Sequence, residues 1–212
     1  MRRAVIALAG LAVLVLVWFL PPRLLVGGAF TGHMIAHMAV VAVASPLLAL
    51  AVAGSRFDPS RHRAFAAAAV PLSLLELLVV WGWHLPGLHD LAQLLPPFKV
   101  LEQASFLTVG LLLWLCCLGY GAGERRRRAA QGTGALLLTS MHMTLLGALL
   151  ALAPRPLYEV ALCLGGRGLT PLQDQNLGGV VMLLVGGAVY LAGGLWLASR
   201  LLQDAPAAVG EG

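Results

Sequence analysis

Charged side chains are scarce in this sequence. Only 11% of its 212 residues are Asp, Glu, Lys or Arg, whereas 59% are hydrophobic and the mean hydropathy is +0.88. A soluble globular domain carries about 25% charged residues. So few polar side chains cannot cover a globule of this size, which excludes an ordinary soluble protein. The sequence therefore predicts an integral membrane protein whose solvent is lipid.

Cysteine is also rare. The chain has three cysteines, and two of them, Cys116 and Cys117, are adjacent within an apolar run. Neighbouring side chains on a helix point about 100° apart, so this pair disfavours both a disulfide framework and a chelating thiol site. The formal net charge of +5 does not indicate a nucleic-acid partner, because the basic residues are scattered between apolar runs.

Long apolar runs are what the sequence has in abundance. Six of them approach the ~20 residues that a helix needs to cross a bilayer. They cover residues 4–20, 34–53, 64–83, 101–120, 133–153 and 177–199. Because the connections are short, we expect a single integral membrane domain over 1–212. Its fold class is all-α, a polytopic bundle of six transmembrane helices.

The first run has the basic start of a signal peptide, because Arg2 and Arg3 precede it. Its 17 uninterrupted apolar residues, 4–20, exceed a usual signal-peptide core, and Pro21 and Pro22 follow directly. No clean A-x-A cleavage site is present. We therefore expect an uncleaved first helix.

The basic residues predict the orientation, since they are retained on the cytoplasmic side of a membrane. With the N-terminus inside, the outer loops carry four: Arg23, Lys99, Arg155 and Arg167. The inner side carries ten: Arg2, Arg3, Arg56, Arg61, Arg63, Arg125, Arg126, Arg127, Arg128 and Arg200. The richness in Ala, Leu and Gly is typical of bacterial membrane proteins. We expect a multi-pass protein of the bacterial plasma (inner) membrane with both termini cytoplasmic.

Polar side chains gather at the predicted outer face. The helix ends on that side supply His33, Met34, His37, Met38, His84, His89, Asp90, Glu102, Gln103, Asp174 and Gln175. The inner side offers mostly arginine. This asymmetry predicts a binding site at the outer face.

The spacing on the second helix narrows the chemistry. His33 and His37 are four residues apart and lie one above the other, and Met34 and Met38 repeat the spacing about 100° around. Met182 offers a further thioether. Imidazole with thioether suits Cu(I), and imidazole alone also suits Cu(II) or Zn. An interfacial His and a packing Met are the competing interpretation for each residue singly, but the whole pattern favours a metal.

Two ionisable residues lie deeper, at comparable depth. Glu76 falls inside the third helix and His142 inside the fifth. An ionisable group in hydrocarbon is costly and faces the bundle interior or a partner. One hypothesis is that Glu76 pairs with His142, as a proton or ion relay or as an inner metal station. A neutral Glu76 hydrogen-bonded to a neighbouring helix explains the residue equally well.

Taken in order, the motifs of this chain resemble the CtaG-type cytochrome c oxidase assembly factors of bacteria, the caa3-oxidase kind. The matching stretches lie between about residues 30 and 200: His33-Met34-Ile35-Ala36-His37-Met38, Ser45-Pro46-Leu47-Leu48, Trp83-His84-Leu85-Pro86, His89-Asp90, Leu101-Glu102, Ser105-Phe106, Trp114, Pro156-Leu157-Tyr158, Asp174-Gln175, Leu177-Gly178-Gly179 and Met182. No single piece is specific, but the ordered series is.

The resemblance implies a membrane protein needed to make active haem–copper oxidase, by handling copper for that enzyme. It implies functional roles for His33, Met34, His37, Met38, His84, Asp174 and Gln175. The chain departs from the family at Gln103, where relatives usually have His after Glu102, so a ligand present in relatives is missing here. We expect copper, as Cu+ or Cu2+, as the bound metal. The expected partners are an oxidase subunit or a periplasmic copper donor.

We expect ligands His33, His37, Met34, Met38 and His84, no catalytic residue, and supporting roles for His89, Asp90, Glu102, Asp174, Gln175 and Met182. Two other functions stay open. A haem-binding or metal-dependent membrane redox protein would use His37 with His84. A metal or proton transporter would use Glu76 and His142, although no inverted repeat is evident.

Overall fold

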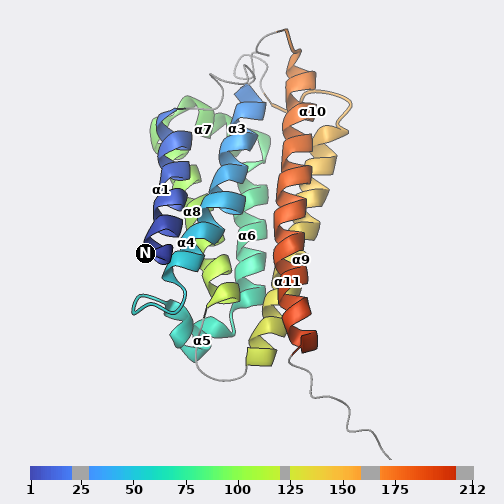
Figure 1. Ribbon diagram of the computed structural model, residues 1–212. Helices are drawn as coiled ribbons and strands as arrows, with labels where there is room; N and C mark the ends of the chain where they lie inside the picture. The colour runs from blue at the N-terminus through green and yellow to red at the C-terminus, as the bar shows by residue number, and fades with distance from the viewer. Residues whose placement is uncertain (21–28, 120–124, 159–167, 204–212) are drawn as a thin grey trace, which may run out of the picture.

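The computed structural model describes residues 1–20, 29–119, 125–158 and 168–203, and this part of the chain forms helices joined by turns, without strands. The long helices pack side by side in one bundle (Figure 1). The elements are α1 (Arg2–Phe19), α3 (Ala29–Met38), η1 (Ala39–Ala44), α4 (Ser45–Val52), η2 (Pro59–Arg61), α5 (Arg63–Ala66), α6 (Ala69–Trp83), α7 (Pro86–Leu94), α8 (Pro96–Leu118), α9 (Arg125–Ala151), α10 (Pro171–Val181), η3 (Met182–Gly186) and α11 (Gly187–Gln203). The π-helical segments η1 and η3 lie within two continuous long helices, α3–α4 and α10–α11.

Five helices of the described chain are long and apolar enough to cross a membrane, and α6 with α7 adds a sixth if that bent pair is one span. Large apolar side chains face outward on them. Leu8, Leu78 and Val100 are 65%, 67% and 69% exposed, as expected where lipid is the solvent. The predicted all-α membrane bundle is therefore confirmed, with five to six spans.

Four helices begin at least five residues earlier than the apolar runs predicted, and one of them is α9, which starts at Arg125 rather than residue 133. The helix containing α3 starts at Ala29 rather than residue 34, α8 at Pro96 rather than 101, and α10 at Pro171 rather than 177. An apolar run marks only the hydrocarbon-facing part of a helix. It therefore leaves out the polar residues of the first turns. Proline is favoured in the first turn, and Thr170 caps α10 through a capping box.

The third predicted helix differs at both ends. Its main part, α6, starts at Ala69, after the separate short helix α5. At the other end Pro86 lacks an N–H and holds Leu85 in an extended conformation, so the chain bends by 72° into α7. His89 and Asp90 therefore lie on a helix and not in a loop.

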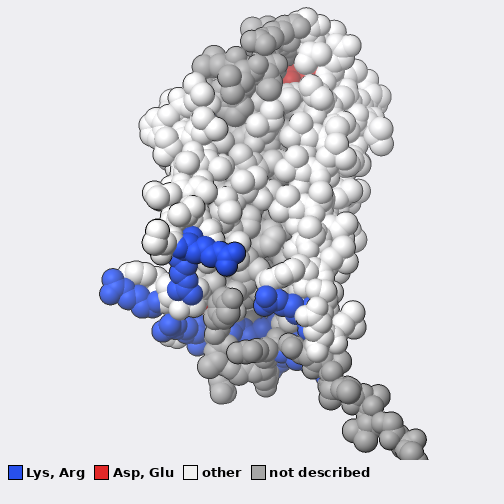
Figure 2. Space-filling model, in the orientation of Figure 1, with Lys and Arg blue, Asp and Glu red and all other residues white. Residues whose placement is uncertain are grey.

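Basic side chains gather at one end of the bundle, the lower end in Figure 2, which we call the arginine end. It comprises the start of α1, the connection from α4 to α5, the start of α9 and the end of α11, with Arg2, Arg3, Arg56, Arg61, Arg126, Arg127, Arg128 and Arg200. Helix α7 and the starts of α3 and α10 lie at the opposite end (Figure 1). The cytoplasmic location of both termini stays a prediction.

The π segment η1 leaves one backbone carbonyl to be satisfied from outside its helix. The Ser45 N–H donates to the Val40 carbonyl five residues back. In the same register the Val41 carbonyl faces Pro46, which has no N–H. A carbonyl without a donor is costly inside a bilayer. Val41 instead accepts a hydrogen bond from Trp114 Nε1 at 3.2 Å, which ties this helix to α8.

Tyr190 links the same carbonyl to a buried carboxyl group. Its hydroxyl oxygen lies 3.3 Å from the Val41 oxygen and 2.5 Å from Glu76 Oε1. Tyr190, Glu76 and Val41 are all 0% exposed, and they belong to α11, α6 and η1. One hydroxyl therefore joins three helices that are far apart in the sequence.

The change Tyr190→Phe removes this hydroxyl and keeps the ring. We expect the free energy of unfolding to fall by about 1–3 kcal/mol, because two buried polar groups lose a hydrogen-bonding partner. Thermal unfolding of the detergent-purified protein measures the change. Ser199→Ala is the control, since it removes an exposed hydroxyl of α11 that bonds within its own helix. Equal melting temperatures for the two variants would contradict the proposed link.

Candidate metal centre

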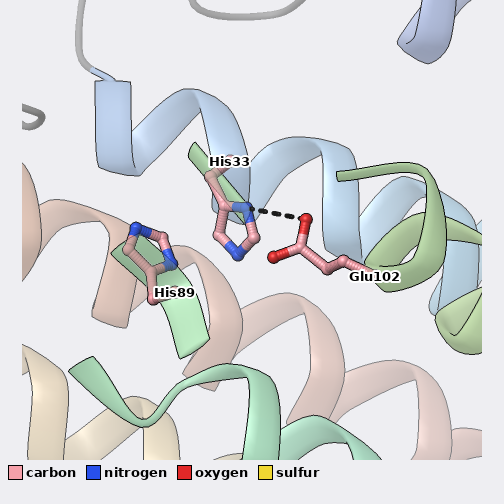
Figure 3. A group of neighbouring side chains, drawn as sticks. All are labelled: His33, His89 and Glu102. Atoms are coloured by element: carbon pink, nitrogen blue, oxygen red, sulfur yellow. Dashed lines mark ion pairs between the residues drawn. The ribbon is translucent and has the colours of Figure 1, made fainter. Parts of the chain in front are cut away.

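Three side chains from three helices converge near the end of the bundle where α7 lies (Figure 3). His33 comes from α3, His89 from α7 and Glu102 from α8, and all three are buried. Each offers one ligand atom, and these atoms lie within 4.8 Å of one another. His33 Nδ1 is 3.8 Å from Glu102 Oε2. This group can hold a metal ion.

Two more imidazoles adjoin this group. His37 follows His33 by about one helical turn, with 6.4 Å between the ring centroids. His84, at the end of α6, places its ring centroid 5.6 Å from that of His33 and 5.4 Å from that of His37. We call the set of His33, His37, His84, His89 and Glu102 the histidine cluster.

Many polar atoms of the histidine cluster have no hydrogen-bond partner among the described residues. They are His33 Nε2, both ring nitrogens of His37, His84 Nε2, His89 Nδ1 and Glu102 Oε1. A buried polar atom normally has a partner, because leaving one unsatisfied costs about 1–3 kcal/mol. Imidazole nitrogens and a carboxylate oxygen that have no hydrogen-bond partner can act as ligands of a metal ion. Imidazole suits Cu, Zn, Fe or Ni.

His84 is oriented by its own helix. Its Nδ1 lies 2.6 Å from the Val80 carbonyl oxygen, which can only accept a hydrogen bond. Nδ1 is therefore assigned the proton, and Nε2 keeps its lone pair. Metal-binding histidines use the same bond from one ring nitrogen to fix the other. The Tyr158 hydroxyl donates to the His84 carbonyl at 3.0 Å and holds this end of α6.

Glu102 has a shell of polar neighbours. The Lys99 ammonium donates to Glu102 Oε2 at 2.7 Å and lies 3.3 Å from His33 Nδ1. The Gln103 amide donates to the same carboxylate oxygen at 3.2 Å. Trp18 Nε1 donates to Gln103 Oε1 at 3.3 Å, which brings α1 into the shell. Gln103 therefore orients Glu102 through its amide.

Asp174 sets the position of α3. Its buried carboxylate, in the first turn of α10, accepts hydrogen bonds from the backbone N–H of Phe30 at 2.9 Å and of Thr31 at 3.0 Å. The Thr31 hydroxyl donates to it at 2.6 Å. The first N–H groups of a helix have no partner within that helix, and an acidic group there is favoured. Because His33 is two residues further along, this contact sets the position of the helical turn that carries its imidazole.

The segment after α9 packs over the histidine cluster. Gln175 Oε1 accepts a hydrogen bond from the Leu157 N–H at 2.7 Å, which anchors this segment to α10. The Tyr158 ring then lies 4.7 Å from the Phe30 ring and 4.4 Å from the His89 ring, centroid to centroid. Gln175 and Tyr158 therefore shield the cluster and hold its framework.

The geometry can be set beside known proteins. The family model described as cytochrome c oxidase caa3 assembly factor matches residues 1–204. The chain belongs to the caa3 assembly factor family. No curated protein and no solved structure matches it. The family membership indicated by the ordered motifs is thus confirmed over nearly the whole chain.

The structure brings the predicted histidine ligands together. His33, His37 and His84 meet in the histidine cluster, as their shared side of the bundle predicted. His89 and Glu102, expected in supporting roles, instead form the metal-capable group with His33. The bend at the start of α7 brings His89 inward, and no pattern in the sequence indicates the direction of that bend. Which of these residues bind metal stays a prediction.

The predicted thioether ligands lie on another side of α3. A Cβ atom placed on Gly178 would be 3.1 Å from Met34 Cγ, and one placed on Gly186 would be 3.2 Å from Met38 Sδ. These side chains therefore pack against α10 and η3. Met182 is also fully buried in the apolar core. Their role as ligands stays a prediction.

The deeper residues are not joined as the relay hypothesis required. Glu76 bonds to Tyr190, and no hydrogen bond between Glu76 and His142 occurs within the described ranges. Both ring nitrogens of His142 lack a hydrogen-bond partner among those residues. Asp90 is half-buried on α7, next to His89. A relay through Glu76 and His142 stays a prediction.

Sequence reasoning missed the role of Lys99. It counted this residue as an outer-loop charge, whereas Lys99 lies in the first turns of α8 and reaches Glu102. The spacing of three residues between Lys99 and Glu102 was the available signal, since such pairs meet on a helix. The apolar run that predicts this helix begins two residues after Lys99, so the predicted helix does not include the Lys99–Glu102 pair.

Asp174→Ala and Thr31→Val test the capping contact. We expect Asp174→Ala to lower the free energy of unfolding by about 1–3 kcal/mol, because the buried N–H groups of α3 lose their acceptor. The effects of the two changes should not add, since the side chains bond to each other. Thermal unfolding of both single variants and the double variant measures the coupling. Additive effects, or a loss no larger than for the exposed control Gln203→Ala, would contradict the contact.

Proposed function

We propose that this caa3 assembly factor binds copper, as Cu+ or Cu2+, at the histidine cluster and passes it to a cytochrome c oxidase subunit. The observation that carries the proposal is the convergence of His33, His89 and Glu102, with unsatisfied donors, in a member of an oxidase assembly family. The rings of His37 and His84 each lie next to the ring of His33, at centroid distances of 6.4 Å and 5.6 Å. They supply further ligands.

The ligand types in the cluster support copper as the bound metal, and the number of ligands supports its transfer to another protein. Among divalent first-row metals, Cu2+ binds nitrogen and oxygen donors most strongly. A bound metal takes about three or four protein ligands, so four imidazoles and one carboxylate leave a donor to spare. A spare donor allows ligands to be exchanged one at a time during delivery. Transfer of this kind makes and breaks only metal–ligand bonds, so the proposed role is non-enzymatic.

The arrangement of charge supports an extracytoplasmic site. Apart from Lys99 and Arg155, the basic residues of the described chain gather at the arginine end (Figure 2), whereas α7 and the start of α3, which carry histidines of the cluster, lie at the opposite end (Figure 1). Because basic segments stay in the cytoplasm, we place the cluster on the outer side of a bacterial plasma membrane. A periplasmic copper donor and the copper-accepting oxidase subunit would meet the protein there.

Copper content tests the proposal. The wild-type protein, purified in detergent, loaded with copper and desalted, is compared with the double variant His33→Ala/His37→Ala by mass spectrometry. We expect the variant to bind copper on the order of 100-fold more weakly, because it loses two imidazoles, and even orienting groups change metal affinity by about 10–100-fold. His62→Ala is the matched control, since His62 is exposed near the arginine end.

Equal copper in the wild type and the double variant would refute copper binding at the cluster. The absorption spectrum of the same sample tests the haem-binding alternative, because bound haem gives a Soret band. A Soret band lost in the variant would replace the copper proposal with a b-type cytochrome.

The orientation has its own test. With both termini cytoplasmic, a green fluorescent protein fused after residue 212 is fluorescent, and an alkaline phosphatase fused at the same point is inactive. Positive-inside charge bias is the physical reason. The opposite pair of results would place the histidine cluster on the cytoplasmic side.

A further inference from the structure

The Lys99 ammonium group stands within the metal-capable group itself. Its Nζ is 2.7 Å from Glu102 Oε2 and 3.3 Å from His33 Nδ1, while these two acceptor atoms are 3.8 Å apart. A positive charge therefore already bridges an oxygen and a nitrogen that a metal ion would take as ligands. An ammonium group and a metal ion compete for the same lone pairs and repel each other at this range.

We propose that Lys99 is the resident cation of the histidine cluster: an incoming metal ion displaces it from Glu102 and His33, and it returns when the metal leaves. This inference rests on the proposed function, because it concerns loading of the same site. It makes Lys99 a determinant of metal affinity and release, without making it a ligand.

The lysine side chain has room to withdraw. It is 38% exposed, whereas the Glu102 side chain is fully buried. Lys99 lines a cavity of about 490 Å³ between α1, α3, α7 and α8. Trp18, His33 and Gln103 line the same cavity. Lysine has a flexible four-carbon stem and a compact charge. Its ammonium group can therefore move from Glu102 into the cavity while the backbone of α8 stays in place.

The exchange keeps the buried carboxylate compensated at every stage. An unpaired charge in a low-dielectric interior is costly. Lys99 neutralises Glu102 before loading, and the metal ion does so afterwards. Release is favoured for the same reason, because the departing metal does not leave a bare carboxylate behind. A site with this property suits a protein that must give its metal away.

The exchange also discriminates between ions by charge. A Cu+ ion carries the same single charge as the ammonium group that it replaces. A divalent ion brings one more positive charge into the buried site, and its repulsion from the withdrawn Lys99 is twice as large. Lys99 therefore penalises Zn2+ more than Cu+.

Replacing Lys99 with leucine tests this role, since the side chain loses its charge and brings no atom that can bind a metal ion. The full-length variant in detergent is titrated with Cu+ against a chromogenic Cu+ chelator, and with Zn2+ against a Zn2+ chelator. We expect Cu+ to bind about tenfold more tightly than in the wild type, because no charge-assisted hydrogen bond has to be broken. The gain for Zn2+ should be larger, and transfer of Cu+ to the chelator should be slower.

Lys99→Arg is the matched control. It keeps the positive charge, so its Cu+ affinity should stay close to that of the wild type. Glu102→Gln in both backgrounds is the second control. Without the carboxylate the ammonium group has nothing to neutralise, so Lys99→Leu should then give little or no gain in affinity.

An observation on the wild-type protein makes the inference independent of any variant's folding. Lys99 is the only lysine in the chain, so lysine labelled with ¹³C at Cε gives a single side-chain NMR signal. Cu+ is diamagnetic. Titration with Cu+ should move this signal as the ammonium group leaves the carboxylate, with saturation at the same ratio as copper binding.

The outcomes separate the two proposals. Copper binding by the wild type with no gain in Lys99→Leu, or with an unmoved lysine signal, overturns the resident-cation role and leaves copper binding in place. Weaker binding in Lys99→Leu also overturns it, because Lys99 would then support metal binding. Binding by neither protein overturns both proposals. Binding by Lys99→Leu alone supports the resident cation and refutes unassisted copper uptake by the wild type.

Discussion

A bilayer offers no water to a polar atom, so each buried polar group must find its partner within the protein. The framework of this bundle follows that constraint closely. Pro46 leaves the Val41 carbonyl without a donor in its own helix, and Trp114 and Tyr190 supply hydrogen bonds from two other helices. The first N–H groups of α3 are satisfied by Asp174. Polar contacts of this kind determine which helix faces meet, because apolar surfaces alone pack in many ways.

The histidine cluster departs from that constraint. Its framework is satisfied at the edges, by Asp174 behind α3 and by the Val80 carbonyl behind His84. The ring nitrogens that face inward are left without partners among the described residues. Rigid support around unsatisfied donors is the arrangement that holds ligands in place for a metal ion. At Glu76, by comparison, Oε1 bonds to Tyr190 and one oxygen, Oε2, has no partner among the described residues.

A feature of this fold can be predicted when residues close together in the sequence determine it. A feature that depends on contacts between separate helices cannot be predicted in this way. Helix number and the side of the bundle follow from local composition, so the sequence predicts that His33, His37 and His84 lie at the same end. That their rings meet depends on helix rotation, which the sequence does not predict. Helix starts were predicted too late, because polar first turns such as Lys99 to Glu102 carry no apolar signal. The inward position of His89 depends on the direction of a bend at Pro86, and the packing of Met34 against Gly178 depends on helix rotation. Neither is encoded within one helix.

Gln103 contributes to the electrostatics of the site, at the position where the resemblance to the family implies a histidine. Its amide donates to Glu102 and accepts from Trp18. The carboxylate therefore receives hydrogen bonds from both Gln103 and Lys99 on the same oxygen, while Oε1 stays free within the described chain. In the proposed exchange of cations, this amide would keep Glu102 in position when Lys99 leaves. The carboxylate would then need no movement of its own, because only the lysine side chain has to withdraw.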